Sequence, residues 1–450
     1  MDILKIGFCI RDQSYAEIIE RYFESLDNEK FDIVFISENN INTKYKNIVL
    51  NDYIDENSNK DIPFLDRKIW KNQEIYKADP RFINKDKSIN RTMYFEYIFA
   101  CRKIFAKENF DVIFSGSAGR LIWTVPHLVA LEKNVLAYKL VPADYLNPYF
   151  EGFRIWFCTD IFWDIDINSH YDFDWPSKKT EEQISLLKKS MIQDNFNLAA
   201  RAIKSRERYT PSKFSNIFKN IIRVILKNDF LSKQRLKSLY HSKKNKRYYV
   251  DIQNLPKKYF IYPLNQPFDE QLLVRAPSYT DTIKNIKLIA RNLPKEVDLI
   301  VKEHPVNPGM ISTKHIKNLE HEFKNIKFID PKLPIRPLIL KSVGLITINS
   351  TAGIESLICN KKIIVLGDSY YKYNDMVFKP KTELEIKNAM QEILNQDNFD
   401  FSSTNYMIKQ LLNQTYPESS TYPSKKGDGN QFIKDALLYK INQLYNIKNP

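Results

Sequence analysis

The sequence predicts an α/β protein with two domains, each built around a mostly parallel sheet. First, short hydrophobic runs typical of buried strands alternate with segments of helical spacing in both halves of the chain. Second, 450 residues is a length suited to two or three domains. Third, a strongly basic stretch separates the halves, because residues 201–250 hold 15 Lys and Arg against two acids, nearly all of the net charge of +14. We therefore expect a basic helical insert between two α/β domains.

These observations divide the chain into four regions. We expect an N-terminal α/β domain over 1–178, a basic helical linker or insert over 179–254, a C-terminal α/β domain over 255–395 and a helical tail over 396–450. The tail could cross back to pack against the first domain.

The first domain opens with a strand–helix–strand pattern. This opening lacks G-x-G-x-x-G, so no dinucleotide fingerprint supports NAD or FAD. The expected elements of this domain are strands over 3–10, 31–37, 110–114 and 135–141, and helices over 15–26, 92–107 and 121–131.

The second domain repeats the alternation of strands and helices. Its expected strands are 259–264, 297–302, 323–330, 338–341, 343–348 and 362–366, and its expected helices are 281–293, 352–357 and 384–394, followed by a tail helix over 432–445.

Two strands of the second domain end in residues suited to anion binding. His304 directly follows one strand, and Pro305 beside it cannot extend that strand, so the imidazole is held on a loop. Ser350 and Thr351 follow another strand and precede a helix, as N-cap residues do. Ligands of open α/β sheets bind outside the carboxyl ends of the strands, and helix N-termini attract anions. The predicted ligand is a phosphate or diphosphate held between His304 and the Ser350/Thr351 pair.

The motifs K-E-H-P and N-S-T-A-G-I-E-S-L-I-C-N-K-K-I-I-V-L-G, about forty residues apart, resemble the capsule polysaccharide synthesis family. That family includes bacterial Kdo transferases, and the pattern is also similar to the HP and SS motifs of bacterial sialyltransferases. The resemblance covers roughly residues 259–373. It implies two Rossmann-like domains facing a cleft (a GT-B-like arrangement) and a CMP-sugar donor. Teichoic-acid polymerases that use CDP-glycerol carry similar motifs, so the resemblance supports a CMP- or CDP-activated donor more firmly than one sugar.

The resemblance implies a donor-phosphate contact for the His-Pro pair. Glu355 matches an acidic residue of the following helix; it either accepts from ribose hydroxyls or is a buried partner of Lys302, which adds positive charge near the anion. The expected donor-binding residues are Lys302, Pro305, Gln266, Ser350, Thr351 and Glu355. The expected catalytic residues are His304 and, as base or nucleophile, Asp269, with Asp12, Glu270 and Glu303 as open alternatives.

Three residues of the first domain are candidates for the acceptor site. Glu151 and Arg154 lie in an aromatic-rich stretch, 144–175, and Arg120 ends a small-residue loop. Aromatic faces with charged neighbours often hold sugars, although core packing and a plain tight turn explain the same residues. Two D-x-D triplets, 164–166 and 172–174, suit either Mg²⁺ or a surface turn. We expect no metal, because a CMP donor releases only a phosphate monoester.

The segment Phe214–Leu231 has the pattern of a basic amphipathic helix. Such a helix can lie on an anionic membrane or pack on its own domain with a solvated basic face. RNP, KH and zinc-finger signatures are absent from the sequence, so we expect no nucleic-acid partner. The polar N-terminus does not suit a signal peptide, and no apolar stretch reaches the ~18 residues of a membrane span. We expect a cytoplasmic protein, with peripheral attachment to the inner face of the cell membrane as an option.

These features together predict a glycosyltransferase of bacterial surface polysaccharide synthesis. Its donor would be a CMP-activated sugar, with Kdo or a similar acidic sugar preferred, and its acceptor a glycan or glycolipid. No cofactor beyond the nucleotide sugar is expected. A CDP-glycerol-type glycerophosphotransferase and a non-catalytic membrane-docking assembly protein are the two alternatives.

Overall fold

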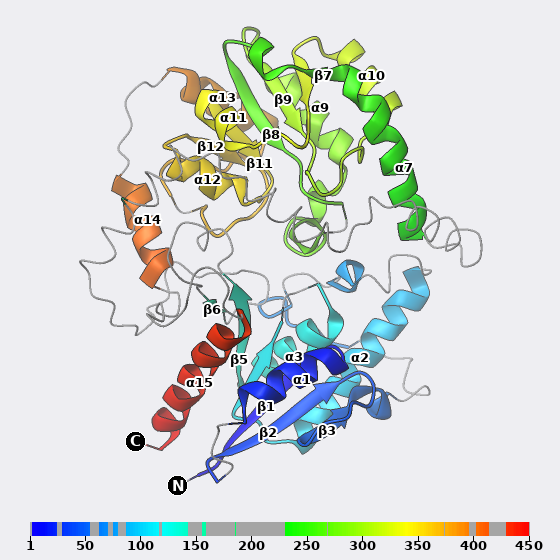
Figure 1. The fold of residues 1–450 in the computed structure, drawn as a ribbon, viewed down its shortest axis with the longest axis vertical. Helices are drawn as coiled ribbons and strands as arrows, with labels where there is room; N and C mark the ends of the chain where they lie inside the picture. Colours follow the sequence, from blue (N-terminus) through cyan, green and yellow to red (C-terminus); the bar gives the residue numbers. More distant parts are fainter. Residues whose placement is uncertain are drawn as a thin grey trace. The chain divides into compact units, whose positions relative to one another are not determined.

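The chain forms two compact α/β units (Figure 1). Unit 1 comprises residues 1–176 and 410–450, and unit 2 comprises residues 177–409. The computed structural model describes residues 2–24, 29–54, 63–70, 75–79, 87–116, 119–142, 155–158, 185, 230–267, 269–372, 374–395, 402–413 and 429–449. Each unit contains a mainly parallel sheet, which confirms the predicted fold class of two Rossmann-like domains.

The sheet of unit 1 has the strand order β3-β2-β1-β4-β5-β6. All neighbouring strands are parallel except the pair β5 and β6. This is the order of a doubly wound sheet, in which the chain moves outward from the first strand and then returns to its other side. Its strands are β1 (Leu4–Ile10), β2 (Phe31–Ser37), β3 (Lys46–Val49), β4 (Val112–Ser115), β5 (Leu136–Pro142) and β6 (Ile155–Cys158), and its helices are α1 (Gln13–Tyr22), α2 (Lys87–Lys107), α3 (Leu121–Glu132) and α15 (Gly429–Lys448).

Helix α15 belongs to unit 1 although it ends the chain. Leu437 and Ile441 are fully buried in one hydrophobic cluster with residues of β1, β2 and α1. The ring of Tyr445 packs against Phe31, with centroids 5.3 Å apart. The last helix is therefore part of the first domain's core.

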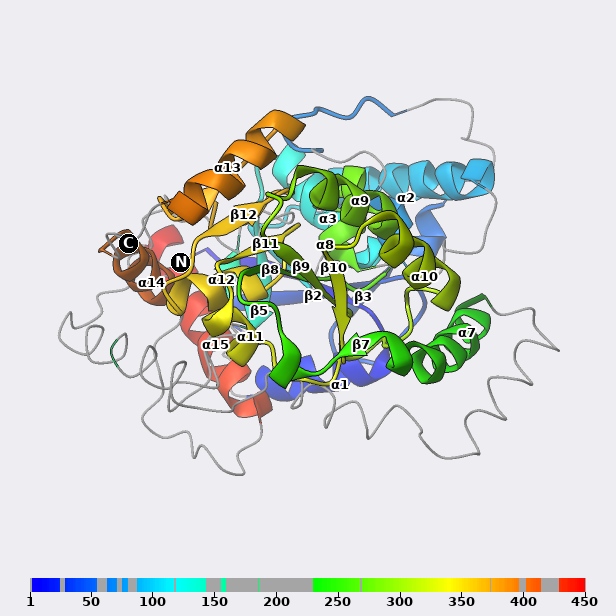
Figure 2. The same cartoon turned by 90° about the horizontal axis from the view of Figure 1, so that it is seen from above.

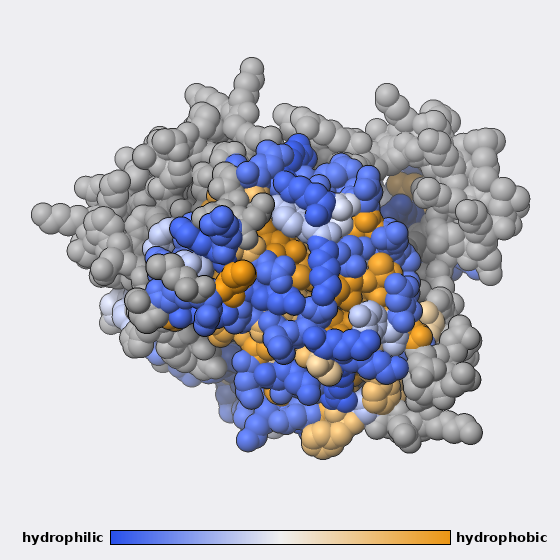
Figure 3. Space-filling view, turned by 90° about the horizontal axis from the view of Figure 1, so that it is seen from below, coloured by the Kyte–Doolittle hydropathy of each residue, from blue (hydrophilic) through white to orange (hydrophobic). Residues whose placement is uncertain are grey.

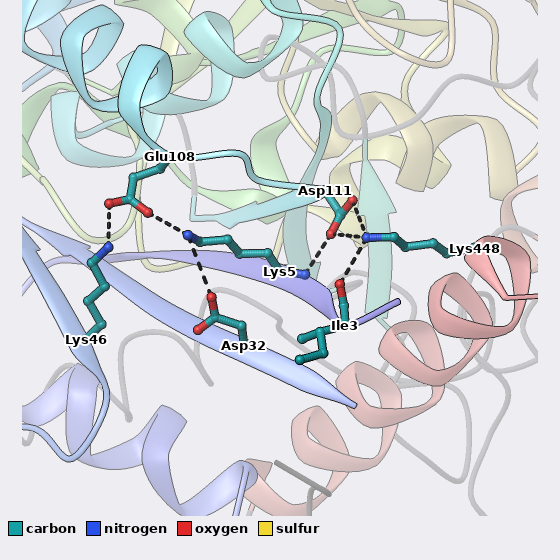
Figure 4. Close-up of polar contacts among 7 residues, drawn as sticks. All are labelled: Ile3, Lys5, Asp32, Lys46, Glu108, Asp111 and Lys448. Carbon is teal, nitrogen blue, oxygen red and sulfur yellow. Dashed lines mark hydrogen bonds and ion pairs between the residues drawn. The ribbon is translucent and has the colours of Figure 1, made fainter. Parts of the chain in front are cut away.

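Polar contacts at the start of β1 hold the end of α15 (Figure 4). The Lys448 ammonium donates to both carboxylate oxygens of Asp111, at 2.9 and 2.8 Å, and to the carbonyl of Ile3 at 3.0 Å. Asp111 also accepts from the backbone N–H of Lys5 at 2.7 Å, and the Lys5 ammonium reaches Glu108 at 2.6 Å. The two chain termini thus lie side by side in unit 1.

The sheet of unit 2 has the order β13-β12-β11-β8-β9-β10-β7, with all neighbours parallel. From β8 the chain moves to β9 and β10, and then returns to place β11 on the other side of β8, which is again a doubly wound order. The strands are β7 (Tyr249–Val250), β8 (Tyr259–Pro263), β9 (Asp298–Lys302), β10 (Ile326–Ile329), β11 (Gly344–Thr347), β12 (Ile363–Val365) and β13 (Val377–Phe378).

Helices cover both faces of this sheet, as Figure 2 shows with α9 and α13 on one side and α11 and α12 on the other. Inward side chains such as Phe260, Leu299 and Ile286 form one buried cluster under α9 and α13. Burial on both faces explains why the strands are continuous hydrophobic runs. The helices are α7 (Phe230–Asn245), α8 (Glu270–Leu273), α9 (Thr282–Asn292), α10 (Thr313–Glu322), α11 (Arg336–Lys341), α12 (Ala352–Ile358), α13 (Glu383–Asn395) and α14 (Ser402–Asn413).

One expected strand was wrong. Residues 338–341 belong to helix α11, which begins at Arg336 with Pro337 in its first turn. Proline suits that position because the first N–H groups of a helix have no partner within the helix. Four apolar or basic residues were too short a window to distinguish a strand from a helix by periodicity.

The described surface is predominantly polar on the face that Figure 3 shows, where hydrophobic residues are scattered between hydrophilic ones. Within the residues that the structure describes, no helix combines the length and hydrophobicity needed to cross a bilayer.

Candidate functional site

The carboxyl ends of β8, β9 and β11 form the candidate site in unit 2. β8 lies between the other two strands, with Pro263 in register with Lys302 of β9 and Phe260 in register with Gly344 of β11. The chain direction across the sheet reverses between β8 and β11, which is the position where open α/β sheets bind their ligands. Strands in a sheet are ~4.8 Å apart, so the ends of β9 and β11 lie about 10 Å from each other.

A pair of asparagines joins the loops after β8 and β11. The side-chain amide of Asn265 donates to the side-chain oxygen of Asn349 at 3.0 Å, and the amide of Asn349 donates to the carbonyl of Gln271 at 2.7 Å. Both asparagines are buried. The side-chain oxygen of Asn265 is also buried and has no hydrogen-bond partner among the described residues. This pair forms a polar floor under the point of reversal.

His304 stands at the start of the loop 303–311, which we call the His304 loop. The backbone N–H of Val306 donates to His304 Nδ1 at 3.2 Å, and the N–H of Asn307 donates to the His304 carbonyl at 2.9 Å. Since Nδ1 accepts, this hydrogen bond assigns the proton of the neutral ring to Nε2. The ring is partly exposed. An Nε2–H donor at the end of a strand is suited to a phosphate oxygen.

Gln266 and Asn307 connect the loop after β8 to the His304 loop. The side-chain amide of Asn307 donates to the side-chain oxygen of Gln266 at 3.2 Å. Through Asn265 and Gln266, the loop after β8 therefore contacts the loops of both neighbouring strands.

The hydroxyl pair after β11 is arranged differently from a standard N-cap. Thr351 precedes helix α12, but its backbone is already helical and its side chain makes no capping hydrogen bond. The Ser350 hydroxyl instead bonds to the Thr347 hydroxyl at 2.9 Å, and the Ser350 N–H donates to the same oxygen at 3.0 Å. Tyr371 donates its hydroxyl to the Ser350 carbonyl at 2.7 Å. Ser350 is thus held by its neighbours, while Thr351 is exposed.

Lys302 and Glu355 lie below this surface. Lys302 is buried and donates to the carbonyl of Pro331 at 2.6 Å. Burial lowers the pKa of Lys302 to about 8, although the carboxylates of Asp330, Glu355 and Glu303 act to raise it. The sequence analysis predicts that Lys302 lies near the bound anion. In the structure its ammonium donates to the backbone carbonyl of Pro331 instead.

Glu355 has Arg336 as its ionic neighbour. Arg336 Nε lies 3.5 Å from a carboxylate oxygen of Glu355, and both side chains are buried. Burial raises the pKa of Glu355, against the opposing effects of Arg336 and Lys302. The predicted alternative of a buried, paired Glu355 describes this geometry, with Arg336 as the partner in place of Lys302. The sequence analysis missed Arg336 because it predicted a strand over 338–341, and the pairing with Glu355 joins two helices, α11 and α12, that are separate in the sequence.

Glu303 points into its own loop. Its carboxylate accepts from the backbone N–H groups of Gly309 and Ile311, at 2.9 and 2.7 Å, and lies 3.3 Å from the hydroxyl of Tyr249. Burial raises the pKa of this carboxyl, while the three donors act to lower it. A carboxylate that is buried and bonded in this way supports the loop, so Glu303 is a poor base for an acceptor.

Asp269 begins helix α8. Its side chain accepts from the backbone N–H of Gln271 at 3.2 Å, which makes it the N-cap of that helix. Asp269 is partly exposed and lies six residues after the end of β8. Its position is compatible with a contact to a substrate bound at the same edge, and its role as base stays a prediction.

Comparison with known proteins gives this geometry a context. The family described as "Capsule polysaccharide biosynthesis protein" matches residues 181–420, just over half of the chain. The chain belongs to this family. The match covers α7, the whole sheet of unit 2 and the His304 loop.

Curated relatives of this capsule family match over shorter stretches. The capsule polysaccharide export protein KpsS of Escherichia coli is 29% identical over 28% of this chain and 34% of its own length. The capsule polysaccharide modification protein LipB of Neisseria meningitidis is 32% identical over 25% of this chain and 29% of its own. The chain thus spans about a third of the length of the curated relatives it matches.

The solved structures that align with most of this chain are distant in sequence. The β-Kdo 2,7 transferase KpsC of Thermosulfurimonas dismutans has 11% identity and a TM-score of 0.40, over 97% of this chain and 99% of that one. A UDP-GlcNAc 2-epimerase from Methanocaldococcus jannaschii has 13% identity and a TM-score of 0.29, over 91% and 99%.

In unit 1 of this capsule-family chain, the structure places some of the expected acceptor residues. Arg120 precedes α3 after β4, at the reversal of strand order between β1 and β4. Partial burial acts to raise the pKa of Asp12 after β1, but the N–H of Tyr15 and the charges of Arg11 and Arg120 outweigh it and hold the pKa below its usual range. Arg11 and Arg120 therefore lie close enough to Asp12 to affect its charge.

Other expected residues lie outside the described part of the chain. These are Glu151, Arg154, both D-x-D triplets and all but the last two residues of Phe214–Leu231. Of the donor set, the structure brings Gln266, His304, Ser350 and Thr351 to one edge of the sheet and places Lys302 and Glu355 beneath it.

Proposed function

We propose that this chain is a glycosyltransferase of bacterial capsule or lipid-linked surface polysaccharide synthesis. It would transfer Kdo, or a similar acidic sugar, from a CMP-activated donor to a glycan or glycolipid acceptor. The observation that carries the proposal is a joint one. The chain belongs to a capsule polysaccharide biosynthesis family, and its His304 and Ser350 loops flank the strand-order reversal of unit 2.

The donor phosphate would bind across the ends of β8, β9 and β11. His304 would donate its Nε2–H to one phosphate oxygen, and the hydroxyls of Ser350 and Thr351 would donate to others. A phosphate with one hydrogen-bonding group on each side suits the spacing of about 10 Å between the two strand ends. Donors aimed at the phosphate would stabilise the charge that develops on the leaving CMP as its bond to the sugar breaks.

Gln266 and Pro305 would complete the donor contacts, and Asp269 would take the proton of the acceptor hydroxyl. Asp269 lies on the loop after β8, in the same unit as His304. Lys302 and Glu355 would support the site from below as part of a buried charge cluster. A metal ion is not required by this scheme, because the leaving group carries one phosphate.

The acceptor would be held by Arg120, Glu151 and Arg154, as the sequence predicts. We also propose a cytoplasmic location, with the basic segment Phe214–Leu231 binding an anionic membrane where a lipid-linked acceptor resides. The high positive charge of this region supports that placement.

A donor panel tests the proposed function. The purified chain is incubated with CMP-Kdo, CMP-sialic acid, CDP-glycerol and UDP-GlcNAc together with a capsule glycolipid acceptor, and the released nucleotide is measured with and without EDTA. Release of CMP from an acidic CMP-sugar is expected, with EDTA having no effect. Release only from CDP-glycerol would favour the glycerophosphotransferase, and the absence of both turnover and nucleotide binding would favour a non-catalytic assembly protein.

A further inference from the structure

Helix α7 lies directly against the His304 loop. Gly309 in that loop has φ +80°, and a Cβ at this residue would lie 2.1 Å from the Ser238 carbonyl and 2.4 Å from the Ser242 nitrogen of α7. Only glycine satisfies both the backbone angle and the close approach. Loop backbone and helix backbone are therefore in contact at a position where no other residue fits.

Asn245, the last residue of α7, fastens the same loop. Its side-chain amide donates to the carbonyl of Ile311 at 2.9 Å, and the N–H of Ile311 donates to Glu303 at 2.7 Å. Both hydrogen-bonding groups of the Ile311 backbone are thus fixed, one by the helix and one by the residue that precedes His304. Asn245 is fully buried, so water does not compete for this bond.

A second set of bonds fixes the side chain of Asn245. Its oxygen accepts from the Thr313 hydroxyl at 2.8 Å. The Thr313 N–H lies 3.3 Å from Nδ1 of His241, one turn earlier in α7. The side-chain amide of Asn245 therefore has a defined orientation, with its nitrogen directed at Ile311.

The strand that follows α7 reaches the loop as well. Tyr249 of β7 pairs with Phe328 of β10 and directs its hydroxyl at Glu303, 3.3 Å away. Helix and strand together therefore contact the His304 loop at three points, Gly309, Ile311 and Glu303. Each of these three residues is within seven residues of His304 in the sequence.

We infer that α7 sets the position of the His304 ring, and that Asn245 and Glu303 are positioning residues for it. They act through the backbone of the His304 loop and not by touching a ligand. The part of this inference that concerns phosphate binding rests on the proposed function; the part that concerns the ring does not. It gives α7, which lies in the basic stretch 201–250 of the sequence, a role in the donor site, because this helix contacts the backbone of the His304 loop.

The test compares two asparagines that are matched in setting. Asn245 ends α7 and Asn292 ends α9; both are buried, and Asn292 donates to the Leu288 carbonyl at 2.8 Å. Asn245→Ala and Asn292→Ala each remove a bond from an asparagine to a backbone carbonyl at a helix end, and Asn245→Ala also removes the bond from the Thr313 hydroxyl. Only the first touches the His304 loop. Thr313→Val serves as a milder variant if Asn245→Ala folds poorly, because it removes the bond that orients Asn245 and leaves the bond to Ile311.

Two readouts separate a positioning role from a merely structural one. Nitrogen NMR of labelled histidine reports which ring nitrogen of His304 is protonated. Isothermal titration reports the affinity for CMP. We expect the wild type and Asn292→Ala to share the Nε2–H form, and Asn245→Ala to mix the two forms and to bind CMP about tenfold more weakly, which is 1.4 kcal/mol. Thr313→Val is expected to change both readouts in the same direction by less.

Equal ring protonation and equal CMP affinity in Asn245→Ala and Asn292→Ala would overturn the inference. If CMP binds to none of the proteins, the proposed donor is wrong, but the NMR comparison still decides whether Asn245 positions His304. If CMP binds and the ring changes while affinity does not, the link from α7 to phosphate binding is wrong.

Discussion

Asn265 and Asn349 bond to each other at 3.0 Å across the place where the strand order of unit 2 reverses. One residue follows β8 and the other follows β11, so this contact ties together two loops that the chain separates by more than eighty residues. Polar groups at such a reversal are well placed to face a ligand. The contact also connects the two loops that lie on either side of the candidate site.

Replacing Asn349 with Ala should destabilise unit 2 and weaken ligand binding together. The change removes the bond to Asn265 and leaves the Gln271 carbonyl without its donor. Loss of buried hydrogen bonds of this kind costs about 1–3 kcal/mol. Urea denaturation measures the free energy of unfolding, and CMP titration measures the binding. If the variant loses stability but binds CMP like the wild type, the Asn265–Asn349 pair does not contribute to the donor site.

The buried charges of Arg336 and Glu355 give a second prediction. Removing one partner leaves the other buried without its ionic neighbour, so Arg336→Leu or Glu355→Leu alone should cost about 3–5 kcal/mol. The double variant should cost less than the sum, because neither member of the pair is left buried without the other. A double-mutant cycle of unfolding free energies measures the coupling. Additive losses would show that Arg336 and Glu355 do not stabilise each other.

Lys302 predicts a specific dependence of stability on pH. Its pKa is about 8 in the folded chain, because of burial, and near 10.5 when unfolded. Between these values the unfolded state binds more protons, so the contribution of Lys302 to the free energy of unfolding rises with pH through this window, by up to about 3 kcal/mol. Below pH 8 the buried charge disfavours folding throughout.

The measurement is the unfolding free energy of the wild type minus that of Lys302→Met from pH 7.5 to 10.5. This difference should increase with pH. Replacement of the exposed Lys341 by Met is the control for the loss of one lysine charge at the surface. A flat or falling difference for Lys302→Met would mean that the ammonium is not desolvated.

Two residues of helix α15 should contribute very different amounts to the free energy of unfolding. Ile441 is fully buried in the core of unit 1, whereas the ion pair of Lys448 with Asp111 is partly exposed. Ile441→Ala should therefore cost about 2–5 kcal/mol, and Lys448→Ala no more than about 1 kcal/mol. Thermal or urea unfolding of the two variants checks the ranking. The reverse ranking would mean that α15 is held by charge and not by packing.

Much of the fold follows from local patterns in the sequence. Strands such as Phe31–Ser37 are mostly hydrophobic because nearly all of their residues are buried, and helix α12 begins directly after the Ser-Thr pair, although Thr351 makes no capping hydrogen bond. The strand order is not local, since it depends on packing between distant segments. Helix α7 lies inside the expected basic helical insert, but its packing could not be predicted from the local sequence, because it depends on Gly309, sixty-four residues after Asn245.

The residues of the candidate site were predictable where they directly follow the end of a strand in the sequence. His304, Gln266 and Ser350 each lie within three residues of a strand, so their common edge follows from the parallel sheet. The roles of Lys302 and Glu303 were not predictable, and for Glu355 two alternatives stayed open, because the sequence does not show whether a charged side chain beside a site points toward solvent or into the core. Burial decides between the two, and burial depends on the surrounding fold.

The most direct measurement compares the affinities of CMP and cytidine, since the two ligands differ only in the phosphate. Isothermal titration of the wild type, His304→Ala, Ser350→Ala and the control His321→Ala, an exposed histidine of α10, gives the ratio for each protein. We predict that the wild type and His321→Ala prefer CMP strongly, and that His304→Ala and Ser350→Ala each lose at least about tenfold of that preference, or 1.4 kcal/mol. A CMP-to-cytidine ratio unchanged by either substitution would show that these two loops do not hold the donor phosphate.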